Sequence, residues 1–229
     1  MATGAEPASD TSEHFTRALC AAPALNDARA MDSDFGLHEA IYNCRAMRRM
    51  KPDPVDEALI VELIDAANQG PSASNRQHDR WIVLTDADQR AAMADLNRAS
   101  IDASYGAPSS GGKQTAFEWQ YENLQDVPVH IVACLKLEDR NDTFHGGVAA
   151  GGSIWGKVQN LLLAARAVGL GACPTTLPLG DRAQAKRVLG VPDAVEPFCL
   201  IPVGWPTGRF GPVTRRPLDH ILHWNEYKS

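Results

Sequence analysis

The amino-acid sequence predicts an α+β fold, in which helices pack in layers against a sheet. Two observations point to this class. Segments with the periodicity of amphipathic helices and short apolar runs typical of buried strands are both present, but they do not alternate regularly as in a βαβ chain. In addition, the sequence has no early G-x-G-x-x-G turn, which disfavours a Rossmann domain. We therefore expect a central sheet flanked by helices.

The chain has 229 residues, which is enough for one large domain and a short extension. Residues 1–34 are rich in Ala, Ser and Asp and contain a single aromatic residue, Phe15, so they cannot form a core of their own. We expect a partly flexible N-terminal extension over residues 1–34, and we hypothesise that it becomes ordered against a partner subunit. Residues 35–229 are expected to form the folded domain.

The first elements of this domain are expected to be two helices and a strand. Apolar residues recur with helical spacing from Leu37 onward, and Lys51-Pro52 ends that segment. Asp53-Pro54 predicts the start of the second helix, with Asp53 as N-cap and Pro54 at the first helical position. Gly70-Pro71 ends this helix. The apolar run at residues 81–84 predicts a strand.

The remaining elements alternate in type without a fixed repeat. In chain order we expect a polar helix at 88–96, a loop at 100–115, a buried strand at 128–137, a long helix capped by Ser153 and closed by Gly169, a short helix from Asp181 to Gly190, and a last strand at 198–204. A tail rich in Pro, Gly and Arg follows.

Composition excludes several classes of function. The net charge of −6 argues against nucleic-acid binding as the main role. The 5 cysteines are scattered and form no C-x-x-C pair, so we expect no disulfide framework and no metal site, and a cytoplasmic location. No run approaches the roughly 18 apolar residues that span a bilayer. The motifs of zinc proteases, α/β-hydrolases and P-loop enzymes are missing as well.

Two clusters of arginines stand at opposite ends of the domain. They comprise Arg45, Arg48 and Arg49 near the start and Arg209, Arg215 and Arg216 near the end. Guanidinium groups bind phosphate in a bidentate manner and keep their charge at all physiological pH values. If the clusters meet in space, they form a site for one phosphate. The alternative is that each cluster is a solvated charged surface.

Between these clusters lies the segment Gly70-Pro71-Ser72-Ala73-Ser74-Asn75-Arg76-Gln77, directly after the second helix. Its hydroxyl and amide groups offer several hydrogen-bond donors and acceptors on a tight loop, which suits a polyhydroxylated chain or the edge of a heterocycle. A segment of this composition is also compatible with an ordinary turn.

Taken together, four motifs resemble those of the flavin-dependent nitroreductase family. They are C-R-A-M-R-R-M-K-P-D-P-V (Cys44 to Val55), A-A-N-Q-G-P-S-A-S-N-R-Q (Ala66 to Gln77), Q-N-L-L-L-A-A-R-A-V-G-L-G-A-C (Gln159 to Cys173), and P-V-G-W-P followed by R-R-P-L-D-H-I (Pro202 to Ile221). The resemblance covers the chain from about residue 37 to its end. It implies a three-layer α+β fold with a mixed central sheet, assembled as an interlocked homodimer with FMN at the subunit interface.

The resemblance also implies which residues contact FMN. They are Arg45, Ala46, Arg48, Arg215 and Arg216 at the phosphate, Pro71, Ser72, Ala73, Asn75 and Gln77 near the ribityl chain and ring, and Pro174, Thr175 and Thr176 against the ring system. Arg49 is expected to point elsewhere. The chain departs from the family pattern at two places. Cys44-Arg45-Ala46 stands where Arg-Arg-Ser is common, and Gln77-His78-Asp79 replaces Gln-Pro-Trp, with Trp81 as a candidate to fill that space.

The chemistry implied by the resemblance is carried by the flavin. NADPH or NADH would reduce FMN, and a nitroaromatic, quinone or similar electron-poor acceptor would reoxidise it in a ping-pong cycle, so no catalytic side chain is expected. A backbone N–H of Thr175 or Thr176 is expected to face the flavin N5. Two alternatives remain open: a reductive dehalogenase resembling iodotyrosine deiodinase, and a non-catalytic protein that only holds the flavin.

The acceptor pocket is expected to be covered by a segment of the other subunit, with Tyr105 or Trp119 stacking on a planar substrate. The alternative for this region is a helix whose Phe117 and Tyr121, four residues apart, form a core stripe. The sequence does not indicate the physiological acceptor or the choice between NADH and NADPH.

Overall fold

The computed structural model describes residues 36–108, 114–137 and 148–227. The extension predicted over residues 1–34 lies outside the described residues. The described residues all belong to one compact unit. Within the described ranges, no helix is both long enough and apolar enough to cross a membrane.

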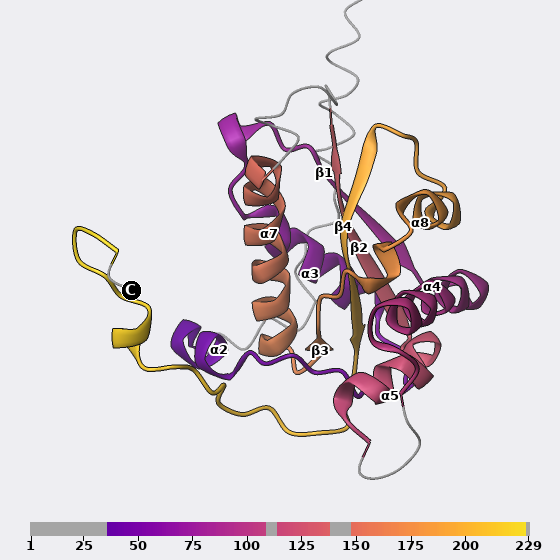
Figure 1. The fold of residues 1–229 in the computed structure, drawn as a ribbon, viewed down its shortest axis with the longest axis horizontal. Helices are drawn as coiled ribbons and strands as arrows, with labels where there is room; N and C mark the ends of the chain where they lie inside the picture. Colours follow the sequence, from indigo (N-terminus) through magenta and orange to yellow (C-terminus); the bar gives the residue numbers. More distant parts are fainter. Residues whose placement is uncertain (1–35, 109–113, 138–147, 228–229) are drawn as a thin grey trace, which may run out of the picture. The chain divides into compact units, whose positions relative to one another are not determined.

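A sheet of four strands lies at the centre of this unit (Figure 1). The strands are β1 (Asp79–Leu84), β2 (Val129–Lys136), β3 (Gly171–Ala172) and β4 (Val195–Gly204), in the order β1-β2-β4-β3. The α+β class is confirmed, but the described sheet is antiparallel at each of its pairings, and not mixed as we expected. The first connection illustrates this: after β1 the chain enters β2 at the same end of the sheet, so the two strands run in opposite directions. Leu84 at the end of β1 pairs with His130 at the start of β2.

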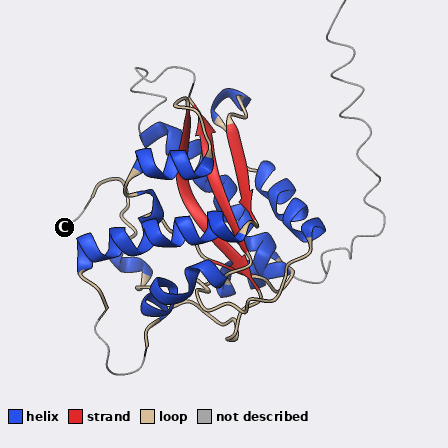
Figure 2. Ribbon diagram, turned by 90° about the vertical axis from the view of Figure 1, so that its right-hand side faces the viewer, coloured by secondary structure: helices blue, strands red, loops and turns tan. Residues whose placement is uncertain are grey.

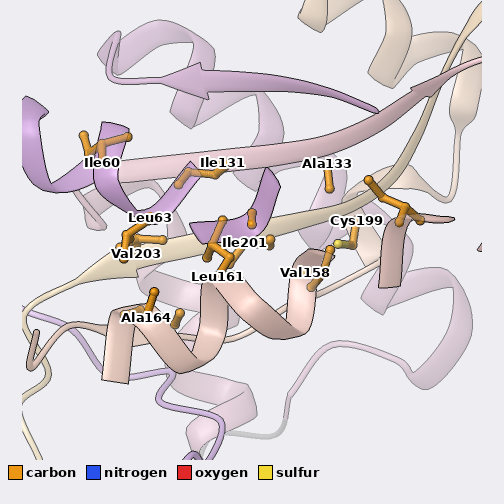
Figure 3. Packing of buried hydrophobic residues seen from close by; sticks show 14 of the residues in the cluster. Ile60, Leu63, Ile131, Ala133, Val158, Leu161, Ala164, Cys199, Ile201 and Val203 are labelled. Carbon is orange, nitrogen blue, oxygen red and sulfur yellow. The ribbon is translucent and has the colours of Figure 1, made fainter. Parts of the chain in front are cut away.

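Helices cover both faces of the sheet (Figure 2), which gives three layers. On one face, α3 (Glu57–Asn68) and α7 (Val148–Ala167) contribute to a buried cluster that includes Leu63, Ile131, Leu161 and Ile201, as seen in Figure 3. On the other face, α4 (Ala87–Tyr105) and α8 (Arg182–Leu189) pack with Val132 and other strand residues. Strand β2 is buried over nearly its whole length because alternate side chains enter the two layers.

The first two helices differ from expectation at their ends. Helix α2 (Leu37–Asn43) stops well before Lys51-Pro52, because the following backbone pairs with other segments, as in the hydrogen bond from Lys51 N to Trp205 O at 2.8 Å. Helix α3 is capped by Asp56 and not by Asp53. The Asp56 carboxylate accepts from Ala58 N at 2.9 Å, while the Pro54 carbonyl accepts from the Trp205 indole at 3.1 Å. Because Asp56 is the N-cap, Pro54 lies outside the helix.

Helix α4 is longer than the expected 88–96 and includes residues 100–105 of the expected loop. Met93, Asn97 and Ile101, spaced by one helical turn, are all buried and so continue the helix through this region. The part of that loop at 109–113 lies outside the described residues. Residues 116–123 then form α5 (Ala116–Asn123), which begins with a capping box between Thr115 and Glu118. Phe117 and Tyr121 are therefore on a helix.

The later elements agree closely with the sequence. Helix α7 begins upstream of Ser153, and Gly169 follows its end with a φ of 81°. Helix α8 is confirmed in detail: the Asp181 carboxylate accepts from Gln184 N at 2.9 Å, and Gly190 ends the helix with a φ of 64°. Left-handed φ values of this kind are easily adopted by glycine. The predicted strands are all present, and β4 begins three residues early at Val195.

Candidate functional site

The two ends of the folded unit run side by side. Thr207 N donates to Arg49 O at 3.1 Å, and Val213 N donates to Tyr42 O at 3.3 Å. Met47 N also donates to Ala172 O at 3.4 Å, which joins the early segment to strand β3. These backbone contacts bring the arginine-rich segment after α2 and the C-terminal segment to the same part of the molecule.

A hollow of about 410 Å³ lies between these segments and α7. Its lining consists of Ile41, Tyr42, Cys44, Arg45, Ala46, Gln159, Leu162, Ala172, Pro174, Val213 and Arg215. The structure thus brings together Arg45 and Arg215, which are one arginine from each of the two clusters, together with the predicted Ala46 and Pro174. Among the described residues that line the hollow, none is acidic. The two guanidinium groups make it a cationic site that suits an anion.

The other arginines of the clusters do not line this hollow. Arg49 donates to the Gln114 carbonyl, so it points elsewhere, as expected. The charge of Arg48 is felt by the Cys173 thiol. Burial raises the pKa of Cys173, and the positive charge of Arg48 acts in the opposite direction. Arg209 and Arg216 are exposed. Arg45 and Arg215 are exposed as well, and they differ from Arg209 and Arg216 in that they line the hollow.

The thiol in the lining stays neutral. Burial raises the pKa of Cys44, with the charge of Arg166 acting in the opposite direction, and Cys44 Sγ lies 3.7 Å from the Leu162 carbonyl oxygen. A thiol with a raised pKa is protonated at neutral pH and adds no negative charge. The cationic character of the hollow is therefore not offset by Cys44.

Arg166, which the motifs did not indicate, connects α2 with the C-terminal segment, and both elements contribute residues to the lining of the hollow. Its guanidinium lies 3.4 Å from the Glu39 carboxylate of α2 and 4.3 Å from the centre of the Phe210 ring in the C-terminal segment. It stands in the last turn of α7. A basic residue at the end of a long helix was the available signal, but its two partners are far away in sequence.

The loop at residues 71–77 lies against an earlier part of α7. Ala73 N donates to Ser153 Oγ at 3.1 Å, and Gln77 N donates to Ser72 Oγ at 3.2 Å. Ser153 and the hollow-lining Gln159 are six residues apart on one helix, or about 9 Å along its axis. The predicted Pro71, Ser72, Ala73, Asn75 and Gln77 are thus outside the hollow but follow the same helix as its lining. Asn75 and Gln77 have left-handed φ values of 53° and 52°.

One of the two expected backbone donors is already in use. We expected the N–H of Thr175 or of Thr176 to face the flavin, and the Thr175 N–H donates to Leu200 O at 2.8 Å, while Leu200 N donates back to Thr175 O at 2.9 Å. A backbone N–H has one hydrogen to donate, and this bridge between Thr175 and β4 uses it. Of the two candidate amides, only that of Thr176 remains.

The structure does not bring the two predicted substrate residues to the arginine-lined hollow. Trp119 lines a different hollow of about 870 Å³, together with Met50, Arg90 and Asn123. Tyr105 is 74% exposed at the end of α4, and its ring stands edge-on to Phe117 with centroids 5.9 Å apart. Their role over a partner's cofactor remains a prediction.

Gly171 provides a test of how the arginine segment is held. A Cβ added at Gly171 would lie 3.0 Å from Met47 Cβ, so Met47, which stands between Arg45 and Arg48, would have to shift by a few tenths of an ångström. We expect Gly171→Ala to lower the free energy of unfolding by about 1–3 kcal/mol and to weaken anion binding in the hollow. Denaturant unfolding and ligand titration measure both effects. Gly208→Ala is the control, because its Cβ would lie 3.9 Å from Met47 Cε, an ordinary contact.

Comparison with known proteins places this arrangement in a family. The nitroreductase family model matches residues 41–205. A relative in Methanothermobacter thermautotrophicus, whose name joins NADH dehydrogenase and NAD(P)H nitroreductase, is 31% identical over 192 residues, covering 81% of this chain and 86% of the relative. The iodotyrosine deiodinase of Thermotoga neapolitana is 25% identical over 191 residues, covering 81% of this chain and 95% of that protein.

The fold is shared with solved structures as well. A structure of iodotyrosine deiodinase bound to FMN and 3-iodo-L-tyrosine has a TM-score of 0.66 to this chain at 20% identity, covering 84% of this chain and 100% of that one. At that identity the likeness concerns the fold. The family model, in contrast, matches the sequence from α2 to the end of the sheet and includes three of the four motifs in full. The chain belongs to the nitroreductase family.

Proposed function

We propose that this protein is an FMN-dependent oxidoreductase that takes hydride from NADH or NADPH and reduces nitroaromatic, quinone or similar electron-poor acceptors by a ping-pong mechanism. The observation that carries the proposal is the hollow lined by Arg45 and Arg215, with no acidic side chain among the described residues that line it, in a chain of the nitroreductase family. The relative in Methanothermobacter thermautotrophicus is named for NAD(P)H-dependent activity, and the deiodinase structure was solved with FMN.

The residues present fit FMN in both charge and hydrogen-bonding groups. We assign the phosphate to Arg45 and Arg215, with Arg48 and Arg216 as neighbouring charges and Ala46 as a backbone contact. The loop residues Pro71, Ser72, Ala73, Asn75 and Gln77 would contact the ribityl chain and ring, and Pro174, Thr175 and Thr176 the opposite side of the ring. Bound FMN would supply the redox chemistry. The chain's residues bind and orient it, and the remaining amide of Thr176 is our candidate donor to the ring.

A homodimer is part of this proposal. Several large apolar side chains of α2 and of the C-terminal segment are exposed, among them Leu37 at 68%, Tyr42 at 65% and Trp224 at 75%. Exposed apolar side chains that gather along such segments indicate a protein interface. We infer that a second copy covers them and that Tyr105 or Trp119 of one subunit lies over the flavin of the other. A cytoplasmic location remains a prediction from the cysteine content.

The second candidate is a reductive dehalogenase. It is favoured by the 25% identity to the Thermotoga neapolitana iodotyrosine deiodinase over 81% of this chain. Both candidates need FMN, so they differ only in the acceptor.

Anaerobic reduction tests these assignments. We expect the protein reconstituted with FMN to lose its absorption near about 450 nm, the band of oxidised flavin, when NADH or NADPH is added. Recovery of the band with a nitroaromatic or quinone supports the main proposal, and recovery only with an iodinated tyrosine supports the dehalogenase. Bound flavin that neither nicotinamide reduces indicates a flavin-holding protein, and a protein that binds no FMN contradicts all three. Sedimentation or size-exclusion measurements test the dimer.

A further inference from the structure

Lys157, in the middle of α7, has a fully enclosed side chain. Only 1% of it is exposed, and its Nζ lies 2.7 Å from Oδ1 of Asp79, whose side chain is 7% exposed. The same Nζ lies 3.4 Å from Asn68 Oδ1 and 3.5 Å from the Asn68 carbonyl oxygen. The second carboxylate oxygen of Asp79 accepts from the Trp81 indole at 3.2 Å. Both charged groups therefore have polar partners inside the protein.

The partners of Lys157 have a particular position in the chain. Asn68 is the last residue of α3, and Asp79 is the first residue of β1. One ammonium group thus joins the two ends of the segment 69–78, which we name the flavin loop because it carries the proposed ring and ribityl contacts. Since the ammonium bonds to both ends, it fixes how the flavin loop leaves the helix and enters the sheet.

The same face of α7 holds the flavin loop along its length. Two glycines allow the loop and the helix to lie close together. A Cβ on Gly70 of the loop would lie 2.6 Å from Lys157 Cγ. A Cβ on Gly156 of the helix would lie 3.7 Å from Pro71 Cδ. Ser153 accepts from Ala73 N at 3.1 Å. Residues 153, 156 and 157 are spaced by three and four positions and therefore share one side of the helix.

The flavin loop needs such support because of its backbone. Ser74, Asn75 and Gln77 have φ values of 51°, 53° and 52°, in the left-handed region that residues with a side chain rarely adopt. Such conformations persist where the surrounding structure enforces them, and they gather at ligand sites. A buried ion pair, in turn, adds little net stability compared with apolar residues of similar size. Stability alone therefore does not account for Lys157 and Asp79.

We infer that Lys157 is a positioning residue whose ion pair with Asp79 closes the base of the flavin loop and holds it in its ligand-binding shape before the cofactor arrives. This inference rests on the proposed function for the identity of the ligand. The loop ordering itself is a property of the protein without FMN and can be measured separately.

The test uses three variants of the full chain. Lys157→Met removes the charge and leaves Asp79 buried without its partner. Lys157→Met with Asp79→Asn removes both charges and keeps an oxygen that can accept from Trp81, so it remains foldable if the single variant is not. Lys186→Met is the matched control. Lys186 in α8 is 11% exposed and lies 2.7 Å from Glu196, and it belongs to the layer on the other face of the sheet.

Three quantities are measured for each variant: the melting temperature of the apoprotein, the hydrogen exchange of residues 69–78 in the apoprotein, and the Kd for FMN. We expect the double variant to regain thermal stability relative to Lys157→Met, because no buried charge is left unpaired. Its flavin loop should still exchange faster than in the wild type. Its Kd for FMN should stay raised by about tenfold or more, because only a fraction of the molecules has a binding-competent loop. Lys186→Met should lower the melting temperature without changing loop exchange or Kd.

A double variant with wild-type loop exchange and wild-type Kd overturns the inference, because Lys157 and Asp79 would then be a replaceable structural pair. The two hypotheses can fail separately. If the wild type binds no FMN, the proposed function is wrong, and loop exchange in the apoprotein still decides whether Lys157 positions the loop. If the wild type binds FMN and the double variant binds it equally well, only the positioning role is wrong.

Discussion

Replacing both Arg45 and Arg215 with alanine is expected to weaken FMN binding by about 10²- to 10⁴-fold, since hydrogen bonds to charged groups contribute roughly 1.5–3 kcal/mol each. The two residues line the same hollow, and no acidic group among the described residues lines it with them. Riboflavin, which has the ring and ribityl chain but no phosphate, should bind the variant as it binds the wild type. The loss should thus be specific to the phosphate.

Titration of the apoprotein by flavin fluorescence quenching measures both affinities. Arg209→Ala is the control, because Arg209 belongs to the same C-terminal cluster, is exposed and does not line the hollow. It should leave FMN binding unchanged at moderate salt. Equal losses for FMN and riboflavin would mean that the double substitution disturbs the fold. An unchanged FMN affinity would remove the phosphate assignment.

The second large effect concerns His130 and the pH dependence of stability. His130 in β2 is fully buried, and its Nε2 lies 2.9 Å from the Leu124 carbonyl oxygen. Its buried Nδ1 has no hydrogen-bond partner among the described residues. Burial lowers the pKa of His130 to about 4, with the Arg90 charge acting in the same direction and the hydrogen bond to Leu124 opposing it. The folded protein therefore holds this imidazole neutral.

In the unfolded chain His130 binds a proton below about pH 6.5. Because the folded state resists protonation down to about pH 4, the stabilisation is complete above pH 6.5 and is lost as the pH falls towards 4. The difference in pKa corresponds to about 3 kcal/mol of unfolding free energy over that window. Urea unfolding at a series of pH values measures it.

His130→Gln is the comparison, because a glutamine amide can still donate to the Leu124 carbonyl but does not titrate. The stability of this variant should fall less than that of the wild type between pH 6.5 and pH 4, while the carboxylates titrate in both proteins alike. If the two proteins lose the same free energy over this range, His130 does not control the acid sensitivity.

Local chemistry made several elements predictable from the sequence. The Asp181 cap, the Gly190 and Gly169 terminators and the apolar strand runs depend on residues close together in the chain, and all are present in the structure. The ends of α2 and α3 were predicted wrongly because their backbone or side-chain partners, such as Trp205, lie more than 100 residues away. The same is true of α4, whose continuation depends on burial of Asn97 and Ile101 against other elements.

The departure from the family motif at Asp79 illustrates the same limit. In the sequence it is a substitution in a loop motif without an evident reason. In the structure it is one half of a buried ion pair with Lys157 at 2.7 Å, a residue 78 positions further on. Neither residue has a local pattern that would indicate the other.

The sequence by itself determined the α+β class, most helices and strands, the family and the two arginine-rich segments, because periodicity, caps and motif order are properties of neighbouring residues. Only the tertiary structure decided that Arg45 and Arg215 line one hollow and that Arg49 points away from it. It also decided that the Thr175 N–H donates to the Leu200 carbonyl. Each of these outcomes depends on contacts between segments far apart in the chain, and a side chain's direction follows from the backbone that those contacts hold in place.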